Sequence, residues 1–443
     1  MPAKRARSPT NLEHSTLASS NALRPGQAKR LAWLLMGGVT LLVSYGIAMG
    51  LVRAGWASHR FPHTVLWCAL PYVFAAYSIY RGAWLPAPER TSLLLVTTVT
   101  PFLLLILGFA LMQQPYSRGA VLLVYVLATA WFVMGDWLRR RHHVQRLFCL
   151  DPIIPERLST WCGTGGLHAG DIELCLLPAD TAKLDEFLAF DGVVVDRRVP
   201  ANTERSQLLS QIKFNHMQIY SVEAVAELLS GRKMLPTAQD DLWQMDGNPA
   251  YDVAKRVMDV LMVLVTAPLW LALCATVWVA VQLDSHGPVL YSQLRTGRDG
   301  HPFRLWKFRS MRHTPLPEAV QFAKAHDARV TRIGRFIRRW RLDELPQLVN
   351  VLLGHMSLIG PRPEQVEFVE EFAARIPAYT YRHLVRPGLT GWAQIQHGYT
   401  DSEEGTKVKL SYDLYYVANY SVAMDLLIIF KTLRIMFSGF GAR

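Results

Sequence analysis

The stretch KRVMDVLMVLVTAPLWLALCATVWVAVQLD, from Lys255 to Asp284, decides on which side of a membrane the remainder of the chain lies. Its apolar part, residues 257–283, is long enough to cross about 30 Å of hydrocarbon. Pro268 lies near its centre, where the ring removes a helical hydrogen bond and kinks the axis. A straight helix would carry the following charged residues across the membrane, whereas a helix that bends and returns would not. Periodicity fits both forms and does not decide between them.

Four further apolar blocks precede this stretch, and each is long enough to span the hydrocarbon. Their interiors contain no Lys, Arg or Glu, and their only acid is Asp136 near an end. Buried helices of a large soluble core are the alternative, but those would show polar faces at the helical period. We predict a four-helix transmembrane bundle over residues 31–141, with spans at 31–52, 64–80, 91–112 and 119–138.

Lys and Arg are distributed unequally around these blocks. Twelve flank the spans on the side of the N-terminus, whereas only Arg53, Arg60 and Arg118 lie on the other side. The positive-inside rule therefore predicts that both ends of the bundle, and the residues that follow it, are cytoplasmic. Residues 1–30, rich in Ser, Asn, Ala and Arg, are predicted to form a disordered basic arm.

Composition limits the partners of the chain. Hydrophobic residues make up 51% of the sequence and charged ones 19%, which excludes a mostly disordered protein. The net charge of +12 suits anionic partners such as phosphates or a lipid surface, and four membrane spans argue against nucleic acid. The five cysteines are scattered and never form a C-x-x-C pair, so neither a zinc site nor a disulfide framework is predicted.

Residues 142–247 have the composition of a soluble α/β domain. Short apolar runs separated by polar stretches of helical length predict a small parallel sheet of Rossmann-like type. The glycine-rich run from Cys162 to His168 supplies half of a dinucleotide-binding fingerprint, but His168 stands where the third glycine belongs. We favour a loop there and expect no cofactor in this domain. The predicted strands are residues 146–150, 172–177, 192–195 and 218–221.

Two basic segments follow the Pro268 stretch. In residues 287–311, glycines and cations alternate with aromatic residues, which suits either a phosphate site or a solvated hairpin at lipid headgroups. In residues 329–341, six arginines alternate with apolar residues, which is typical of an amphipathic helix on an anionic surface.

Asp343 and Glu344 come next, in the run from Leu342 to Leu348. Pro346 is best tolerated in the first turn of a helix, so the two carboxylates are expected at a helix N-terminus. Beside an arginine cluster, two ionised carboxylates are suited to holding magnesium and attacking an electrophile. Taken alone, such a pair is more typical of a helix cap with salt bridges.

The region of residues 251–431 resembles the bacterial sugar transferases, which are monotopic polyprenyl-phosphate hexose-1-phosphate transferases. The bundle and the middle domain resemble the long form of that family. One departure is Ala267-Pro268, where some members carry Ser-Pro. Seven motifs in order carry the resemblance: Lys255-Arg256-x-x-Asp259, Gly287-Pro288-Val289, Lys307-Phe308-Arg309-Ser310-Met311, Leu342-Asp343-Glu344-Leu345-Pro346-Gln347-Leu348, Gly360-Pro361-Arg362-Pro363-Glu364, Arg386-Pro387-Gly388-Leu389-Thr390-Gly391-Trp392 and Tyr412-Asp413-Leu414-Tyr415-Tyr416.

The resemblance implies an α/β catalytic domain over residues 251–443 that includes the re-entrant helix. It implies transfer of a hexose 1-phosphate, with glucose or galactose as the expected hexose, from a UDP-sugar to polyprenyl (undecaprenyl) phosphate. UMP would be released, as the initiating step of exopolysaccharide or related glycan synthesis at the bacterial inner membrane. A homo-oligomer is left open. The rival hypotheses are a non-catalytic membrane scaffold for polysaccharide assembly and a nucleotide-cofactor enzyme working through the middle domain.

The resemblance also implies roles for individual residues. Asp343 would be the nucleophile and Glu344 the ligand of a magnesium ion. The remaining site residues implied are Lys307, Arg309 and Arg338 for phosphate, and Pro361, Arg362 and Pro363 for the nucleotide.

Overall fold

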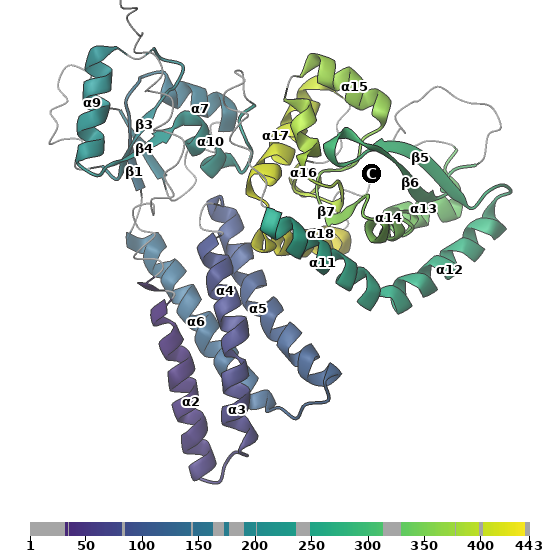
Figure 1. Ribbon diagram of the computed structural model, residues 1–443, viewed down its shortest axis with the longest axis horizontal. Helices are drawn as coiled ribbons and strands as arrows, with labels where there is room; N and C mark the ends of the chain where they lie inside the picture. Colours follow the sequence, from purple (N-terminus) through teal and green to yellow (C-terminus); the bar gives the residue numbers. More distant parts are fainter. Residues whose placement is uncertain are drawn as a thin grey trace, which may run out of the picture.

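The structure, a computed structural model, has three parts: a helical bundle, a small α/β domain and a larger α/β region (Figure 1). The bundle extends away from the other two parts, which lie side by side at one of its ends. The structure describes residues 32–33, 35–81, 85–142, 145–162, 172–176, 190–200, 202–235, 249–312, 329–376, 378–397 and 402–438. The predicted basic arm, residues 1–30, lies outside this set.

The bundle differs from four uniform spans. The second predicted span is two helices separated at Cys68, because Pro71 lacks an N–H and its ring clashes with the carbonyl of Trp67. Within the described residues, three helices are long and apolar enough to cross a membrane, and one of them lies outside the bundle. The bundle helices are α2 (Gly38–Arg53), α3 (Arg60–Trp67), α4 (Ala69–Arg81), α5 (Ala87–Leu111) and α6 (Arg118–His142). The three long apolar stretches are Glu89–Leu111, Arg118–Leu138 and Ala267–Asp284, whereas α2 is shorter.

The middle domain contains the parallel sheet that its sequence predicts. Its four described strands lie in the order β2-β1-β3-β4, and every neighbouring pair is parallel. The strands start from apolar runs whose side chains, such as Leu147 and Val194, are fully buried. The glycine-rich run from Gly163 to His168 lies outside the described residues. The elements are β1 (Gln145–Cys149), α7 (Ile154–Cys162), β2 (Ile172–Cys175), β3 (Gly192–Val195), α9 (Thr203–Phe214), β4 (Gln218–Ser221) and α10 (Val222–Ser230).

The larger region combines helices with two small sheets. Strands β5 and β6 form an antiparallel hairpin in which Tyr291 faces Lys307, and β7 pairs with β8 in parallel. Its elements are α11 (Pro249–Val265), α12 (Ala267–Asp284), β5 (Leu290–Thr296), η4 (Arg298–Gly300), β6 (Pro302–Phe308), α13 (Arg332–Arg339), η5 (Leu342–Glu344), α14 (Gln347–Leu353), β7 (Ser357–Ile359), α15 (Val366–Arg375), η6 (Tyr379–Leu384), β8 (Gly388–Thr390), α16 (Trp392–Gln396), α17 (Glu403–Asn419) and α18 (Val422–Ser438).

The predicted break at Pro268 is present. Helices α11 and α12 meet at Thr266 and form a wide V (Figure 1). Pro268 lies in the first turn of α12, where its missing N–H leaves no helical bond unmade. Two side chains stabilise the junction, because Thr266 Oγ1 donates to the Met262 carbonyl at 2.7 Å and Trp270 Nε1 donates to the Val263 carbonyl at 3.0 Å.

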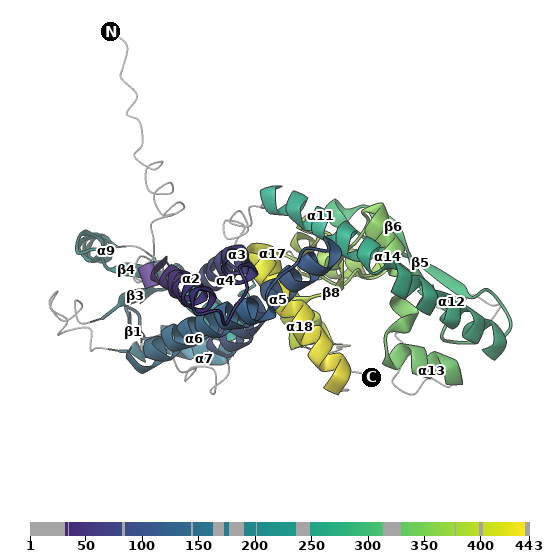
Figure 2. The ribbon, with the colours of Figure 1, turned by 90° about the horizontal axis from the view of Figure 1, so that it is seen from below.

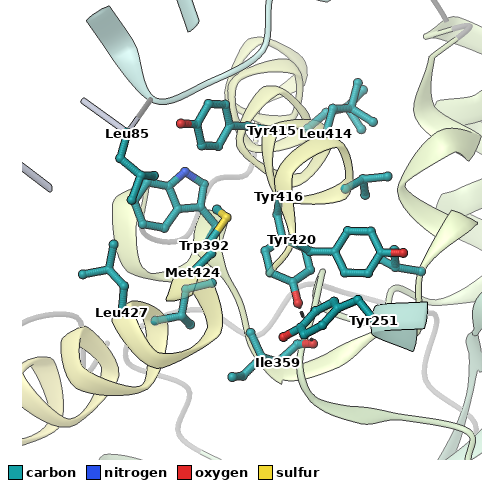
Figure 3. Close-up of a cluster of buried hydrophobic side chains, with 14 of the residues drawn as sticks. Leu85, Tyr251, Ile359, Trp392, Leu414, Tyr415, Tyr416, Tyr420, Met424 and Leu427 are labelled. Carbon is teal, nitrogen blue, oxygen red and sulfur yellow. Dashed lines mark hydrogen bonds between the residues drawn. The ribbon is translucent and has the colours of Figure 1, made fainter. Parts of the chain in front are cut away.

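The base of α11 is fixed by the buried carboxylate of Asp425 in α18. Tyr251 and Tyr416 each donate a hydroxyl to this carboxylate at 2.8 Å, and Lys255 forms an ion pair with it. Tyr251 and Tyr416 lie together in the close-up of the core (Figure 3). The neighbouring Arg256 donates to the last carbonyls of α14, including Leu352 O at 2.8 Å. The Lys255-Arg256 motif therefore anchors α11 to α14 and α18.

We predict that Asp425→Ala is strongly destabilising, because it removes the ion-pair partner of the buried Lys255 ammonium and the acceptor of the Tyr251 and Tyr416 hydroxyls. Loss of one partner of a buried pair costs about 3–5 kcal/mol. Thermal unfolding of the detergent-solubilised protein should show a large drop in Tm. The matched control is Lys407→Ala in the surface pair with Glu404, which should leave Tm unchanged. Equal Tm values for the two variants would contradict the anchoring role.

Candidate active site

Asp343 and Glu344 lie in the short 3₁₀ turn η5, immediately before α14. The sequence predicts Pro346 in the first turn of a helix and the pair at the N-terminus of that helix; in the structure Pro346 is the N-cap of α14 and the pair precedes it in η5. The turn follows Arg341, whose backbone is left-handed with φ 53°. This conformation is unfavourable for a residue other than glycine, and such strain is typical of functional sites.

Glu344 is enclosed by cations. Its side chain is 8% exposed, and its Oε1 accepts from Arg362 at 2.9 Å and from Lys307 at 3.1 Å. Its Oε2 lies 3.7 Å from Arg341. Burial by itself raises the pKa of Glu344, but Arg362, Lys307 and Arg341 together hold that pKa well below its usual range. Glu344 is therefore ionised at any physiological pH.

The pKa of the adjacent Asp343 is shifted in the opposite direction. Burial and the charge of Glu344 raise the pKa of Asp343 to about 6, although Lys307, Arg338 and Arg362 act to lower it. Two neighbouring carboxylates thus have pKa values pushed far apart by their surroundings. Such divergence is the usual signature of carboxylates with different roles in one site.

Lys307 and Arg338 reach this pair from two different elements. Lys307 extends from β6, and burial lowers its pKa although Glu344 favours its charged form. Arg338 lies on α13, where its Nε donates to Ser310 Oγ at 2.7 Å. Helix α13 approaches Ser310, two residues after β6, so closely that a Cβ on Gly334 would lie 2.0 Å from the Ser310 carbonyl oxygen. Gly334 is therefore required for the placement of Arg338, and sequence patterns gave no signal of it.

Arg309 has different contacts. Its two terminal nitrogens donate to the carbonyls of Ser285 at 2.5 Å and Pro288 at 2.6 Å. These bonds tie the end of α12 to the end of β6. The predicted role of Arg309 in phosphate binding stays a prediction, while the observed contacts give it a clear part in holding the helix against the hairpin.

The Pro361-Arg362-Pro363 loop follows β7 and is held by its backbone. Gly388 N donates to the Pro361 carbonyl at 2.8 Å, and Arg295 donates to the Pro363 carbonyl at 3.1 Å. With these bonds in place, the Arg362 side chain is directed to Glu344.

A buried network behind this loop was missed at the level of sequence. Arg382, 2% exposed, donates to the Arg362 carbonyl at 2.9 Å and pairs with Asp413 at 2.8 Å. Glu364 joins the network through Arg382, whose guanidinium lies 3.7 Å from its carboxylate, and it also forms an ion pair with Lys409. Asp413 lies in a motif visible in the sequence, but its partner is 31 positions away and only the fold brings them together.

Asp343 and Glu344 carry the carboxylate oxygens of the type that magnesium prefers. Among the described residues, no group of three or more His, Cys, Asp or Glu side chains could hold a metal. Magnesium usually binds one or two carboxylates together with substrate phosphates, so Asp343 and Glu344 are the side chains that would hold it. Glu344 Oε2 is held less closely than Oε1 and is the oxygen that suits a metal ligand.

Comparison with known proteins identifies the family. The chain is 36% identical over 400 residues to the UDP-N-acetylgalactosamine-undecaprenyl-phosphate N-acetylgalactosaminephosphotransferase of Aeromonas hydrophila, which covers 89% of this chain and 92% of that protein. The profile described as Bacterial sugar transferase matches residues 250–439. The chain belongs to the bacterial sugar transferase family. All eight of the site residues predicted from the sequence lie within the region matched by this family profile.

Two other family members match over less of this chain. The UDP-glucose:undecaprenyl-phosphate glucose-1-phosphate transferase of Escherichia coli (strain K12) is 43% identical over 188 residues, 42% of this chain and 40% of that protein. The Exopolysaccharide production protein PSS of Rhizobium leguminosarum bv. phaseoli is 42% identical over 191 residues, 41% of this chain and 93% of that protein. Family membership thus rests on a match that extends well beyond residues 250–439 as well as on shorter matches.

We predict that Asp343 in this family member titrates at about pH 6. Because its pKa is raised in the fold, its contribution to stability is complete below the ordinary pKa and is lost as the pH rises through 6. Asp343→Asn should therefore raise Tm more at pH 8 than at pH 5. Infrared difference spectra of wild type minus Asp343→Asn should show the carboxylic acid at pH 5 and the carboxylate at pH 7.5. A midpoint near pH 4 would contradict the assignment.

Proposed function

We propose that this chain transfers a hexose 1-phosphate from a UDP-sugar to polyprenyl phosphate and releases UMP, as an initiating step of exopolysaccharide or related glycan synthesis. The observation that carries the proposal is the pair of adjacent carboxylates with divergent pKa values, Asp343 and Glu344, inside a group of three cations. The names of the relatives, which specify undecaprenyl-phosphate sugar phosphotransferases, support it.

Asp343 is the proposed nucleophile. Its carboxylate attacks the β-phosphorus of the UDP-sugar, the bond from that phosphorus to the bridging oxygen breaks, and UMP leaves with the electron pair. A phosphate oxygen of the polyprenyl phosphate then attacks the same phosphorus and releases Asp343. The raised pKa supports this role, because a more basic carboxylate is the better nucleophile.

The cations next to the pair have a proposed role in both steps. Lys307, Arg338 and Arg362 all act on the charge of Asp343, so a diphosphate placed beside that carboxylate would be neutralised by the same groups. Glu344 holds Lys307 and Arg362 in place. Repulsion between the carboxylate and the substrate is reduced as a result.

Magnesium is the proposed cofactor, with Glu344 as its protein ligand. When bound, it would add positive charge at the diphosphate. Oε1 of Glu344 would keep its bonds to Lys307 and Arg362, and Oε2 would bind the metal.

The proposed sugar is a hexose carried by UDP. The relative that matches 89% of this chain is named for UDP-N-acetylgalactosamine, whereas the Escherichia coli relative, which matches 42% of it, is named for UDP-glucose. We therefore add UDP-N-acetylgalactosamine to the glucose and galactose expected from the sequence.

The proposed location is the cytoplasmic face of the bacterial inner membrane. The bundle would span the bilayer, and the bent pair α11–α12 would enter and return, so that the site stays near the surface. Large apolar side chains are exposed along α11 and α12, and α13 exposes Phe336 and Trp340 among its arginines. Figure 2 shows α12 and α13 at the same end of the larger region. Such a surface suits contact with lipid and access for the polyprenyl phosphate.

Our first test of the function is nucleotide release. Purified protein incubated with polyprenyl phosphate, magnesium and a panel of UDP-sugars should release UMP with at least one of UDP-N-acetylgalactosamine, UDP-glucose and UDP-galactose. Asp343→Asn should lower this activity by several orders of magnitude, whereas Glu344→Gln should be impaired but partly restored by excess magnesium. Release of UDP, or of no nucleotide as expected for a scaffold, would refute the proposal.

A second test addresses topology. Single cysteines introduced at Asp240 and near the C-terminus of an otherwise cysteine-free chain should both react only with reagents that reach the cytoplasm, because α11–α12 returns to its starting side. Labelling of the C-terminal site from the periplasm would show that the helix pair crosses the membrane.

A further inference from the structure

Trp392 lies where the three parts of the chain meet. It is 1% exposed, and its Nε1 donates to the carbonyl of Gly231, which ends α10 of the middle domain, at 2.8 Å. The Lys431 ammonium of α18 lies 5.4 Å from the centre of its ring. Leu85, which precedes α5 of the bundle, lies beside the indole in Figure 3.

The bundle contributes a charged contact to this junction. The buried carboxylate of Glu89 in α5 forms an ion pair with Lys431 and accepts from Gln396 Nε2 at 3.0 Å. Gly231 has φ 66°, and a Cβ added there would lie 2.9 Å from Pro86 and 3.6 Å from the Trp392 ring. The three parts are thus in close contact around one indole.

The segment that leads into Trp392, from Gly388 to Gly391, is in contact with the Arg362 loop. Gly360 N donates to the Thr390 carbonyl at 2.9 Å, next to the Gly388–Pro361 bond. A Cβ on Gly391 would lie only 2.1 Å from the Gly360 carbonyl oxygen, so the two backbones fit without space for a side chain. A displacement of Trp392 must therefore move the loop that directs Arg362 to Glu344.

We propose that Trp392 is a positioning residue through which the bundle and the middle domain set the placement of the Arg362 loop for binding the uridine nucleotide. The proposal rests on the proposed function, because it assigns nucleotide contact to residues 361–363. It gives the N-terminal half of the chain a role in substrate affinity in addition to membrane attachment.

Trp392→Phe is the central variant, because it fills most of the volume but removes the N–H that reaches Gly231. The KM for the UDP-sugar should rise by about 3–10-fold, which corresponds to the net contribution of about one hydrogen bond. The kcat should stay within about twofold of the wild-type value. If Trp392 only stabilised the fold, the active fraction would fall and kcat would drop at unchanged KM. That second pattern would overturn the proposal.

A binding cycle tests the route through Arg362 without any need for turnover. The Kd of UMP is measured by calorimetry for the full-length wild type, Trp392→Phe, Arg362→Ala and the double variant. The effect of Trp392→Phe should disappear in the Arg362→Ala background, because both changes act on the same contact. Additive effects would show that Trp392 does not act through Arg362.

The matched control is Tyr420→Phe, which removes a hydroxyl that bonds Asp252 at 2.9 Å from the same buried cluster. Its KM should equal that of the wild type, and a KM raised as in Trp392→Phe would overturn the proposal. If Trp392→Phe does not fold, Glu89→Gln is measured with the same criteria, because this change removes the bundle's negative charge that pairs with Lys431. A wild type that releases no UMP would refute the proposed function, whereas normal UMP release with an unchanged KM in the variant refutes only the role of Trp392.

Discussion

The buried charge of Glu344 is the constraint on which the rest of the site depends. Its carboxylate attracts Lys307 of β6, Arg362 of the loop after β7, and Arg341, the strained residue before η5. Without this negative charge the three cations would repel one another, and two of them, Lys307 and Arg362, also act on the second carboxylate, Asp343. Asp343 therefore experiences both a neighbouring anion and a surrounding positive field.

Close contacts between backbones make this arrangement possible. Gly334 lets α13 approach the backbone of Ser310, and the contact of Gly391 with Gly360 fixes the loop before Arg362. Behind that loop, the buried pair of Arg382 and Asp413 holds the Arg362 carbonyl. The cations of the candidate site are thus long side chains, and glycines and a buried ion pair hold the backbone from which they extend.

Close packing also joins the site to the rest of the chain. The buried cluster around Trp392 takes side chains from the loop before α5, from α5 itself and from the larger region, and Figure 3 shows Leu85 within it. A core that is shared in this way couples the membrane bundle to the site by packing, because packed interiors transmit displacements. Within the larger region, the Asp425 carboxylate joins α18 to α11 and α17 through the hydroxyls of Tyr251 and Tyr416.

Local patterns in the sequence determined the parallel strands of the middle domain, the break at Pro268 and the motif that contains Asp343 and Glu344. Pro71 in the sequence also indicates a break near Cys68, although a uniform span was predicted there. Only the tertiary structure decided that Lys307 faces Glu344, whereas Arg309, two residues away, is bonded to the carbonyls of Ser285 and Pro288. Propensity, proline and apolar runs act over a few residues, so sequence reveals them, but an ion pair between residues 37 positions apart depends on how whole elements pack.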